Sequence, residues 1–489
     1  MLMDFMQTIY YIIKLIVVIT YFAGIIYVVI ATILENRNPV KTISWVVVLV
    51  LLPIIGFIFY MFFGQNFRKE KIIARKGLKN HDRISSIANK QANRFSEVEI
   101  LQDSLLEEKR HLITLLLNSS NAVVTMGNRV NILQNGDSTF TAIISAIKNA
   151  KSFIHLEYYI FTDDKIGRQI IELLKQKVKE RVEVRMIVDD VGSWELKTPF
   201  YREMWRARIE IYSFLTVHFP NLTSKINYRN HRKIIVVDGK IGFIGGLNIA
   251  DRYITGNEEV GIWRDTHLQI EGDAVNSLQT VFSIDWYFVS HEELNDKKYF
   301  PYKKPLGDKV VQIVPSSPDS DWPEIMMGLF HAITSSKKSV YIATPYLVPT
   351  EGVLLAIKTA ALGGIDVKVI LPQKGDGVIT SFSTHSYLRE LMEAGVKIYF
   401  YKKGFLHSKV LIIDDYVSII GSANMDFRSL EQNFEITAFI YDENTAKELK
   451  ESFEEDLSNS HQVTLEEWNN RTKMDKVKES FARVISPLM

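Results

Sequence analysis

The sequence predicts an α/β protein made of two copies of one domain, preceded by two helices that cross a membrane. The first 63 residues hold 46 hydrophobic side chains, whereas the rest of the chain has an ordinary globular composition. In that remainder, helical patterns alternate with apolar strand patterns, which is typical of a sheet covered by helices. The alternation occurs twice, at a spacing of about 180 residues, and this indicates a duplicated domain rather than a solenoid.

The composition excludes several classes of protein. The chain has 489 residues, no cysteine, and a formal charge of +1 from 58 basic and 57 acidic side chains. Its hydrophobic content is too high for a disordered chain. The absence of cysteine excludes a disulfide-stapled secreted scaffold and a cysteine-built zinc or iron–sulfur site. The balanced charge argues against a strongly basic nucleic-acid binder, so we expect no nucleic-acid partner.

Residues 1–67 are expected to form a transmembrane hairpin with spans at about 12–34 and 43–63. Leu15–Leu34 and Ile43–Phe63 contain no charged side chain. At about 1.5 Å per residue each stretch reaches about 30 Å, the thickness of a bilayer core. A cleaved signal peptide followed by one anchor is the alternative. It is disfavoured because no basic residue precedes the apolar run and no small-residue cleavage site follows it.

Basic residues near the two spans predict their orientation. The turn between the spans contains Arg37 and Lys41. Six basic residues follow the second span, namely Arg68, Lys69, Lys71, Arg75, Lys76 and Lys79. Because the more basic flank usually faces the cytoplasm, we expect the chain after residue 63 to be cytoplasmic.

The soluble part is expected to begin with a linker and a helix over residues 68–118. Two similar halves follow, over 119–305 and 306–489. The repeat is visible where Lys151-Ser152-Phe153-Ile154 is matched 187 residues later by Lys338-Ser339-Val340-Tyr341. The alternation of helices with apolar strands predicts a largely parallel sheet.

Each half carries the same set of chemically useful residues at the same spacing. In the first half the set is His231, Lys233, Asp238, Gly245, Gly246 and Asn248, and in the second it is His407, Lys409, Asp414, Gly421, Ser422 and Asn424. Each pair of corresponding residues is separated by 176 positions. Two unrelated surface histidines would not share five further positions, so we interpret the set as functional.

The spacing within each set predicts a β-hairpin. His231 and Lys233 are two residues apart on a strand and therefore project from one face. Asp238-Gly239 is a strong signal for a hairpin turn. A two-residue turn at that point pairs His231 with Gly246, which returns the glycine loop to the end of the hairpin that carries the histidine.

The second half is expected to repeat this hairpin and to pair His407 with Ser422. In both halves the aspartate of the set, Asp238 or Asp414, then lies at the far turn. It also has the wrong strand parity to share a face with the histidine and the lysine. We therefore assign these two aspartates structural or supporting roles within the motif.

Two imidazoles, two ammonium groups and two amides are suited to phosphoryl transfer. A neutral imidazole is a nucleophile or a base, and its protonated form is an acid near neutral pH. Lysine supplies a positive charge for phosphate oxygens, and glycine permits a close backbone approach. The residues therefore indicate a reaction through a covalent phosphohistidine. No cluster of metal ligands stands out, so no metal and no cofactor are expected.

The two sets resemble the paired His-Lys-Asp motifs of the phospholipase D superfamily, and over nearly its full length the chain is similar to bacterial cardiolipin synthases. Further segments that carry the resemblance are Asn38-Pro39, Lys41-Thr42, Leu52-Pro53, Phe63-Gly64, His155-Leu156-Glu157-Tyr158-Tyr159, Trp263-Arg264-Asp265-Thr266-His267, Thr344-Pro345-Tyr346 and Ser486-Pro487-Leu488. The resemblance implies two phospholipase D-like domains, each a mixed sheet flanked by helices. It also implies pseudo-two-fold symmetry between them and one site completed within a single chain.

The resemblance also implies roles for individual residues. His231 is implied to be the nucleophile and His407 the general acid and base; the residues by themselves do not determine this order. The catalytic set comprises His231, Lys233, Asp238, His407, Lys409 and Asp414. Phosphate binding and support are implied for Gly246, Asn248, Ser422 and Asn424. Glu435 and Asp265, at matching places in the two halves, are implied to orient the imidazoles.

The activity implied by the resemblance is cardiolipin synthesis. Two phosphatidylglycerol molecules give cardiolipin and glycerol through a phosphatidyl-histidine intermediate, at the plasma membrane of a bacterium and with the lipid bilayer as partner. The alternatives are a phospholipase D-type hydrolase and a phosphatidyltransferase that uses another alcohol. They stay open because residue identities do not determine which acceptor reaches the site. The sequence makes no prediction of the oligomeric state.

Four further segments have functional interpretations of their own. His155 and Glu157 lie at a strand end and are candidates to face the cleft, and His267 is expected near the site or in the core. The extra residues of the first half, within 213–230, include apolar side chains that either reach the bilayer or pack in the core. Residues 473–485 mix apolar and basic side chains, which predicts either an amphipathic helix on lipid or a helix packed on the domain.

Overall fold

A computed structural model describes residues 2–34, 39–52, 56–57, 60, 79–96, 104–217, 228–301 and 304–486. The chain divides into two units. One comprises Met1–Phe67 with Val217–Asn227, and the other comprises Arg68–Thr216 with Tyr228–Met489. Each unit is described by itself.

The smaller unit contains the helices α1 (Leu2–Leu34) and α2 (Pro39–Leu51). Within α1, Phe5–Ile30 has a mean hydropathy of 2.5 over its most apolar stretch and is long enough to cross a membrane. Among the described residues it is the single helix that meets both criteria, because the apolar part of α2 covers only Thr42–Leu51. Residues 53–55, 58–59 and 61–63 of the predicted second span, 43–63, lie outside the described residues, so the two-span hairpin stays a prediction.

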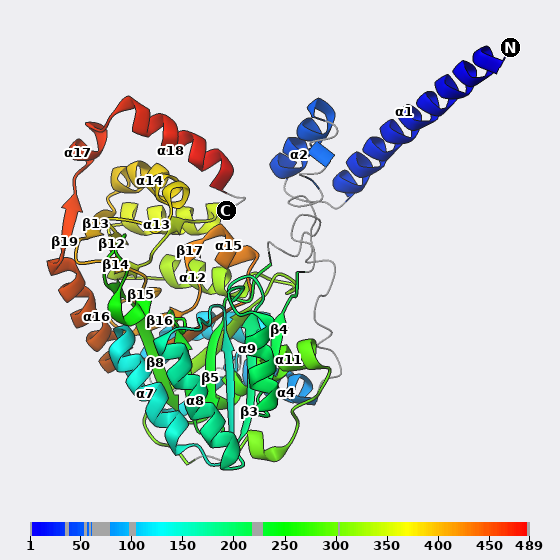
Figure 1. Cartoon of the computed structure of the whole chain (residues 1–489). Coiled ribbons are helices and arrows are strands. Elements are labelled where there is room, and N and C mark those ends of the chain that lie inside the picture. The colour runs from blue at the N-terminus through cyan, green and yellow to red at the C-terminus, as the bar shows by residue number, and fades with distance from the viewer. Residues whose placement is uncertain are drawn as a thin grey trace. The chain divides into compact units, whose positions relative to one another are not determined.

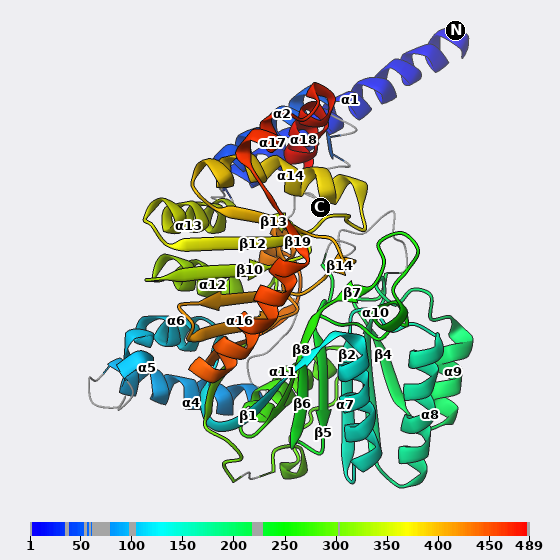
Figure 2. The same ribbon diagram turned by 90° about the vertical axis from the view of Figure 1, so that its left-hand side faces the viewer.

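The larger unit is built on one sheet of 15 strands (Figures 1 and 2). The first half contributes β1 (Val124–Gln134), β2 (Phe153–Tyr158), β3 (Glu183–Asp189), β4 (Glu210–Phe214), β5 (Lys233–Val237), β6 (Ile241–Gly245) and β8 (Thr266–Glu271). The second half contributes β9 (Lys309–Ser316), β10 (Ser339–Ala343), β12 (Asp366–Pro372), β13 (Lys397–Tyr401), β15 (Val410–Ile413), β16 (Val417–Gly421), β18 (Glu435–Tyr441) and β19 (Ser460–Val463). The strand order is β19-β13-β12-β10-β15-β16-β18-β9-β1-β8-β6-β5-β2-β3-β4.

This order repeats outward from the centre of the sheet. Apart from β19, the strands on the two sides of the β9–β1 pair correspond one to one, and β1 and β9 themselves are antiparallel, with Val124 opposite Gln312. The two halves are therefore related by the predicted pseudo-two-fold symmetry. They also share a single continuous sheet, which the sequence analysis did not predict.

The sheet is mixed, and the expectation of a largely parallel sheet was wrong. Only β2–β3, β3–β4, β10–β12 and β12–β13 are parallel pairs within it. The strands that carry the two motifs belong to antiparallel hairpins, β5–β6 and β15–β16. Strands buried on both faces are apolar throughout in either arrangement, so their composition does not reveal the direction of pairing.

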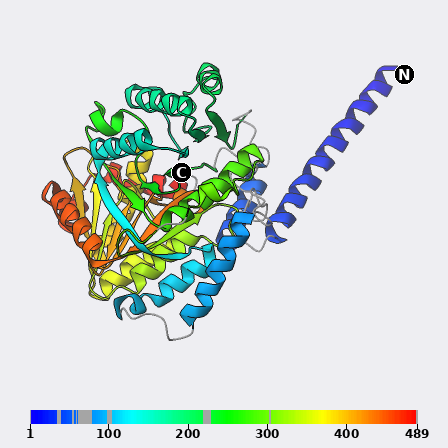
Figure 3. The same ribbon diagram turned by 90° about the horizontal axis from the view of Figure 1, so that it is seen from below.

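Helices lie on both sides of the sheet (Figure 3). In the first half these are α7 (Asn135–Asn149), α8 (Lys165–Lys179), α9 (Thr198–Arg206), α10 (Arg252–Thr255) and α11 (Ala274–Ser290). In the second half they are α12 (Glu324–Thr334), α13 (Glu351–Leu362), α14 (Val378–Glu393), α15 (Phe427–Glu431), α16 (Glu443–Ser458), α17 (Leu465–Asn469) and α18 (Lys473–Ile485). One hydrophobic core is common to both halves, because it contains residues of α11 and of α16.

The predicted linker and helix form α4 (Lys79–Ser96), α5 (Ser104–Glu108) and α6 (Arg110–Ser120), with residues 97–103 outside the description. The amide of Gln91 in α4 bonds both backbone groups of Val124 in β1, at 2.8 and 2.9 Å. Leu106, Leu112 and Leu116 are buried in the core. This segment is therefore part of the body of the larger unit.

Candidate active site

Both motifs lie on hairpins, but the predicted register is wrong by one residue. Val237 pairs with Ile241, so Lys240 is an extra residue between the turn and the ladder. Asp238 and Gly239 both have positive φ, 52° and 61°. The second hairpin repeats this geometry, with Ile413 opposite Val417. Because the extra residue lies next to the turn, the glycine loop still returns to the end of the hairpin that carries the histidine.

Asp238 and Asp414 lie at the far turns, away from the histidines. Asp238 accepts hydrogen bonds from the backbone N–H groups of residues 151–153, at 2.7–3.0 Å. Asp414 accepts the equivalent bonds from residues 337–339 and forms an ion pair with Lys109 at 3.1 Å. Each carboxylate therefore joins a hairpin turn to the start of a neighbouring strand, and neither bonds a motif histidine.

Each motif histidine is held by a carboxylate from the other half of the chain. His231 Nδ1 lies 2.9 Å from Glu435 Oε1, and His407 Nδ1 lies 2.6 Å from Asp265 Oδ2. The side chains of both carboxylates are fully buried. The sequence paired Glu435 with Asp265 by position but did not predict that the two would exchange partners.

Backbone pairing between the halves holds this exchange in place. The N–H of His231 donates to the carbonyl of Phe434 at 2.9 Å, directly before Glu435. The N–H of His407 donates to the carbonyl of Arg264 at 2.7 Å, directly before Asp265. The second contact continues a short parallel pair between β7 (Trp263–Arg264) and β14 (Phe405–Leu406).

The carboxylates determine how the two imidazoles present their nitrogens. Each carboxylate accepts a hydrogen bond from Nδ1–H, so the neutral tautomer carries its lone pair on Nε2. Burial lowers the pKa of His231 to about 4 and that of His407 to about 3, so both rings are neutral at pH 7. Burial alone would raise the pKa of Glu435, but His231 and Lys233 together hold it below its usual value.

The two lysines lie beside the histidines and are also buried. Lys409 Nζ is 2.8 Å from His407 Nδ1 and 3.0 Å from His407 Nε2. Lys233 Nζ donates to the backbone carbonyl of His231 at 2.6 Å. Burial lowers the pKa of Lys409 to about 8 and that of Lys233 well below its usual value. Each ammonium also lowers the pKa of the histidine in the other half, which requires the two motifs to lie close together.

The loop residues of the two motifs are not equivalent. Ser422 Oγ donates to Glu435 and thereby supports the carboxylate of His231. At Gly246 a Cβ atom would lie 2.2 Å from Asp265 Oδ1, so no side chain fits beside the carboxylate of His407. Ser422 therefore has room for its side chain, and its hydroxyl bonds Glu435. At Gly246 the carboxylate of Asp265 already fills the space that a side chain would need.

The two motif asparagines also differ. Asn248 uses both amide atoms within the protein, accepting from Ile160 N at 3.1 Å and donating to Tyr253 OH at 2.7 Å. Asn424 is buried, and its Oδ1 has no hydrogen-bond partner among the described residues. The contacts favour a structural role for Asn248 and leave the amide of Asn424 able to bind a ligand.

Residues 155 and 157 do not face a cleft, so that expectation was wrong. His155 is fully buried, stacks on Phe282 with ring centroids 4.5 Å apart, and bonds Gln279 at 3.0 Å. Glu157 is also buried and accepts a hydrogen bond from Asn230 Nδ2 at 2.6 Å. Glu157 thus positions the residue before His231.

Two other sequence predictions concern residues in or near the core. His267 is fully buried, and neither ring nitrogen has a hydrogen-bond partner among the described residues. In the extra segment of the first half, Phe214 and Leu215 are buried in the core. Residues 218–227, the rest of that segment, lie outside the described residues.

Aromatic rings and a buried arginine complete the surroundings of the histidines. Tyr159 meets His231 edge to face at 4.8 Å between ring centroids, and Trp263 lies 4.9 Å from the ring of His407. Arg232 forms an ion pair with Asp285 and donates from Nε to the carbonyl of Glu435 at 3.1 Å. The His-Lys-Asp pattern did not single out Arg232, although it directly follows the histidine.

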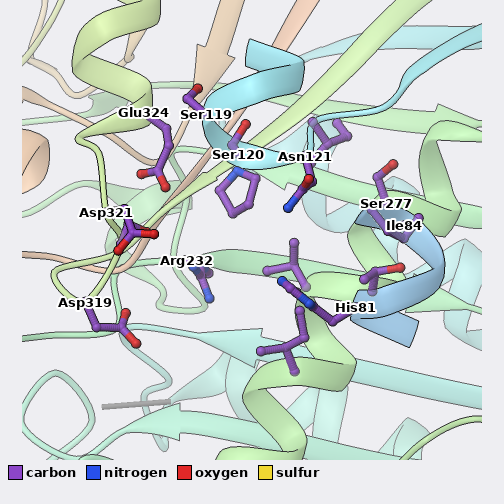
Figure 4. A pocket seen from close by; sticks show the side chains of 16 residues that line it. His81, Ile84, Ser119, Ser120, Asn121, Arg232, Ser277, Asp319, Asp321 and Glu324 are labelled. Carbon is purple, nitrogen blue, oxygen red and sulfur yellow. The ribbon is translucent and has the colours of Figure 1, made fainter. Parts of the chain in front are cut away.

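Arg232 also lines a cavity of about 570 Å³ next to the first motif (Figure 4). His81 and Ile84 of α4 lie on one side of this cavity, and Asp319, Asp321 and Glu324 lie on the other. The cavity is therefore enclosed by the segment that follows the N-terminal unit and by the loop that leads into α12.

Two family models match parts of this chain. A family model described as a cardiolipin synthase, phospholipase D-like domain, matches residues 143–286 and 329–457. A second model, described as a phospholipase D-nuclease N-terminal region, matches residues 21–65. The first model matches both halves, and each match contains one complete His-Lys-Asp set.

Curated relatives extend over almost the same length. Cardiolipin synthase 2 of Bacillus cereus is 42% identical over 93% of this chain and 88% of its own length. A cardiolipin synthase of Halalkalibacterium halodurans is 41% identical over 95% of this chain and 92% of its own. Among solved structures, the phosphatidylserine synthase of Haemophilus influenzae superposes with a TM-score of 0.59 at 15% identity. That match covers 78% of this chain and all of the other, and it supports the fold alone.

Proposed function

The chain belongs to the cardiolipin synthases with phospholipase D-like domains, a family of phosphatidyltransferases, and we propose that its two histidines transfer a phosphatidyl group from one phosphatidylglycerol to another. The observation that carries the proposal is the exchange of carboxylates between the halves. It gives one site two neutral imidazoles whose Nδ1 atoms are engaged and whose Nε2 atoms carry the lone pairs.

In the first step, His231 Nε2 attacks the phosphorus of phosphatidylglycerol. A bond forms between this nitrogen and phosphorus, and the bond from phosphorus to the glycerol headgroup oxygen breaks. His407, as the imidazolium, donates a proton to that oxygen, so glycerol leaves as a neutral alcohol. Burial by itself disfavours this imidazolium, whereas the negative charge of a bound phosphodiester favours it.

In the second step, the neutral His407 takes the proton from a headgroup hydroxyl of a second phosphatidylglycerol. The resulting oxygen nucleophile attacks phosphorus and displaces His231, which gives cardiolipin and restores the neutral imidazole of His231 and the imidazolium of His407. Lys233 and Lys409 supply positive charge to the phosphate oxygens, and Nδ2 of Asn424 is a further donor to them. Asn424 Oδ1, which has no partner among the described residues, can accept a hydrogen bond from a headgroup hydroxyl. Glu435 and Asp265 orient the rings and stabilise each imidazolium when it forms.

The proposed location is the plasma membrane of a bacterium. It is supported by Phe5–Ile30, a helix able to span a bilayer, and by the bacterial sources of the relatives. We place a second span at 43–63 and the catalytic body in the cytoplasm, on the basic residues that follow that span. Protease added outside intact cells should leave the body uncut, and cleavage of it there would refute this orientation.

Product analysis tests the proposed reaction. Purified full-length protein is incubated with phosphatidylglycerol labelled in its acyl chains, in detergent–lipid micelles and with no nucleotide. The proposal predicts labelled cardiolipin and one glycerol released per cardiolipin, and no product with the His231→Ala or His407→Ala variant. Labelled phosphatidic acid without cardiolipin would instead identify a hydrolase, and a different phospholipid formed on addition of another alcohol would identify another acceptor.

A further inference from the structure

The C-terminal helix α18 packs on the body with its polar side and turns an apolar stripe outward. Met474, Val477, Phe481 and Val484 are 62%, 63%, 69% and 77% exposed. Their spacing of three or four residues places them on one face of the helix. An amphipathic helix of a globular body normally buries this face, so the orientation of α18 is the reverse of the usual one.

Polar contacts fix this reversed orientation. Arg483 donates from Nη1 to the carbonyl of Ser386 in α14 at 3.0 Å and forms an ion pair with Glu390. Glu479 is buried and paired with Arg471. Figure 1 shows α18 along the outer side of α14. The body therefore occupies the side of α18 that carries Glu479, and the apolar stripe is left outside.

Lysines border the stripe on both sides. At 100° per residue, Lys473 lies at one edge of the apolar face and Lys478 at the other. Lys476, on the adjoining polar side, is also exposed. Asp475 and Glu479, the two acidic residues of α18, are turned toward the cap residue Thr472 and toward Arg471. The outward surface of the helix thus combines four apolar side chains with lysines and carries no carboxylate.

We propose that this face of α18, defined by Met474, Val477, Phe481 and Val484 with Lys473 and Lys478 at its edges, lies in the surface of a bilayer that contains anionic lipid. Apolar side chains enter the boundary between headgroups and acyl chains, while lysine stems extend along it and place their ammonium groups at lipid phosphates. A protein partner that covered the same surface would need acidic groups around an apolar groove. An anionic bilayer supplies both negatively charged phosphate groups and an apolar interior, and it does so across its whole surface.

This contact is separate from the N-terminal helix and does not depend on the proposed transfer reaction. A short interfacial helix alone gives only reversible binding, and its effect adds to that of an anchor in the same chain because the second contact is intramolecular. The consequence is that the second half of the body is held at the membrane surface. Loss of α18 binding would leave the anchor intact.

The absence of cysteine permits a site-specific test in the full-length protein. A single cysteine at Phe481→Cys is labelled with an environment-sensitive fluorophore, and the protein is reconstituted in nanodiscs that contain phosphatidylserine, an anionic lipid that is not the proposed substrate. Acyl-chain nitroxide lipids report contact with the bilayer. Two matched positions serve as controls: Lys476→Cys, exposed on the polar side of the same helix, and Leu362→Cys, exposed on α13.

The proposal predicts strong quenching of the label at residue 481 and weak quenching at both controls. Each of the replacements Lys473→Glu and Lys478→Glu should reduce the fraction of molecules whose label at residue 481 is quenched by lipid. We expect a reduction of roughly five-fold or more for each lysine replaced. Quenching at residue 481 equal to that at Leu362→Cys would overturn the proposal. A label shielded from both water-soluble and lipid quenchers would also overturn it, because that result means a protein surface, either a second copy or the chain's own N-terminal unit, covers the stripe.

Because the readout is the position of a label, it is independent of catalysis. The same labelled protein can be assayed for cardiolipin formation, so failure of the docking proposal and failure of the proposed reaction give different results.

Discussion

Each of the two imidazoles proposed to be catalytic is held by a carboxylate from a distant part of the chain, since Glu435 is 204 positions from His231 and Asp265 is 142 positions from His407. In a buried site the carboxylate selects the tautomer with hydrogen on Nδ1, and it stabilises the imidazolium that forms during proton transfer. Each half of the chain therefore supplies the carboxylate that orients the histidine of the other half.

Replacing either carboxylate by its amide should reduce catalysis without removing the histidine. For Glu435→Gln and Asp265→Asn we expect kcat to fall by roughly 100-fold to 10,000-fold, because the amide either donates to Nδ1 or leaves the ring free to turn. Cardiolipin formation at saturating phosphatidylglycerol measures this effect. Glu451→Gln, exposed on α16, is the control and should be unchanged; a kcat within two-fold of wild type in both carboxylate variants would contradict the roles assigned to them.

The different loops beside the two carboxylates predict different tolerance to a methyl group. Gly246→Ala places Cβ against Asp265 Oδ1, so the carboxylate must move from His407, and we expect roughly a 100-fold loss of kcat. Ser422→Ala removes one hydrogen bond to Glu435 and needs no movement, so we expect roughly a ten-fold loss. Comparable losses in the two variants would show that the close packing at Gly246 is unimportant.

The pH dependence of the reaction should reflect the loss of the proton from the Lys409 ammonium. Burial lowers its pKa to about 8, so the ammonium is present below pH 8 and is lost as the pH rises through that value. We therefore expect kcat/KM to fall on the alkaline side with a midpoint near 8. In Lys409→Arg, whose guanidinium stays charged, the remaining activity should not show this decline, and an unchanged alkaline midpoint in that variant would assign it to another group.

At the scale of the elements, the aspartate of each motif bonds backbone N–H groups at its hairpin turn, and we expect it to take no part in proton transfer. Asp238 accepts three backbone N–H groups and adopts a positive φ of 52°. Asp238→Ala should therefore lower the free energy of unfolding by about 2–4 kcal/mol, through lost hydrogen bonds and backbone strain. Chemical denaturation measures this change. The kcat per folded molecule should stay within roughly three-fold of wild type, and a loss like that of His231→Ala would make Asp238 catalytic.

The hairpins and β2 show which features of the secondary structure could not be predicted from the sequence. The spacing of His231, Lys233 and Gly246 was sufficient to predict a hairpin with the motif at one end. Its register was missed because Lys240 is accommodated as an extra residue, and Asp238-Gly239 favours a tight turn with or without one. His155 was misplaced because every position of β2 is buried, so alternation gives no indication of which face meets the site.

At the scale of the whole molecule, the duplication of the domain could be predicted from the sequence. The contacts that the two copies make with each other could not. A common offset of 176 residues revealed two copies of the motif. The contact between Glu435 and His231, by contrast, depends on how β18 and β9 continue the sheet into β1 and β8, and no local pattern in the sequence records that pairing. The largely parallel sheet was an error of the same kind, since buried strands are apolar in both directions.

The continuous sheet explains how one chain completes a two-histidine site. Because β9 and β1 pair directly, the two hairpins are held in one body, and the backbone contacts at Phe434 and Arg264 fix each histidine beside the opposite half's acid. The central claim is that this body forms one site, in which His231 bonds phosphorus and His407 moves the protons.

Trapping the covalent intermediate tests that claim most directly. The His407→Ala and His231→Ala variants are mixed with phosphatidylglycerol labelled in its acyl chains, quenched with denaturant at neutral pH to preserve both the phosphorus–nitrogen bond and the acyl esters, and mapped by peptide mass spectrometry. We predict a phosphatidyl adduct on His231 in the His407→Ala variant and no adduct in the His231→Ala variant. An adduct on His407, formed only when His231 is absent, would reverse the two roles, and cardiolipin synthesis by wild type with no adduct in either variant would contradict the covalent mechanism.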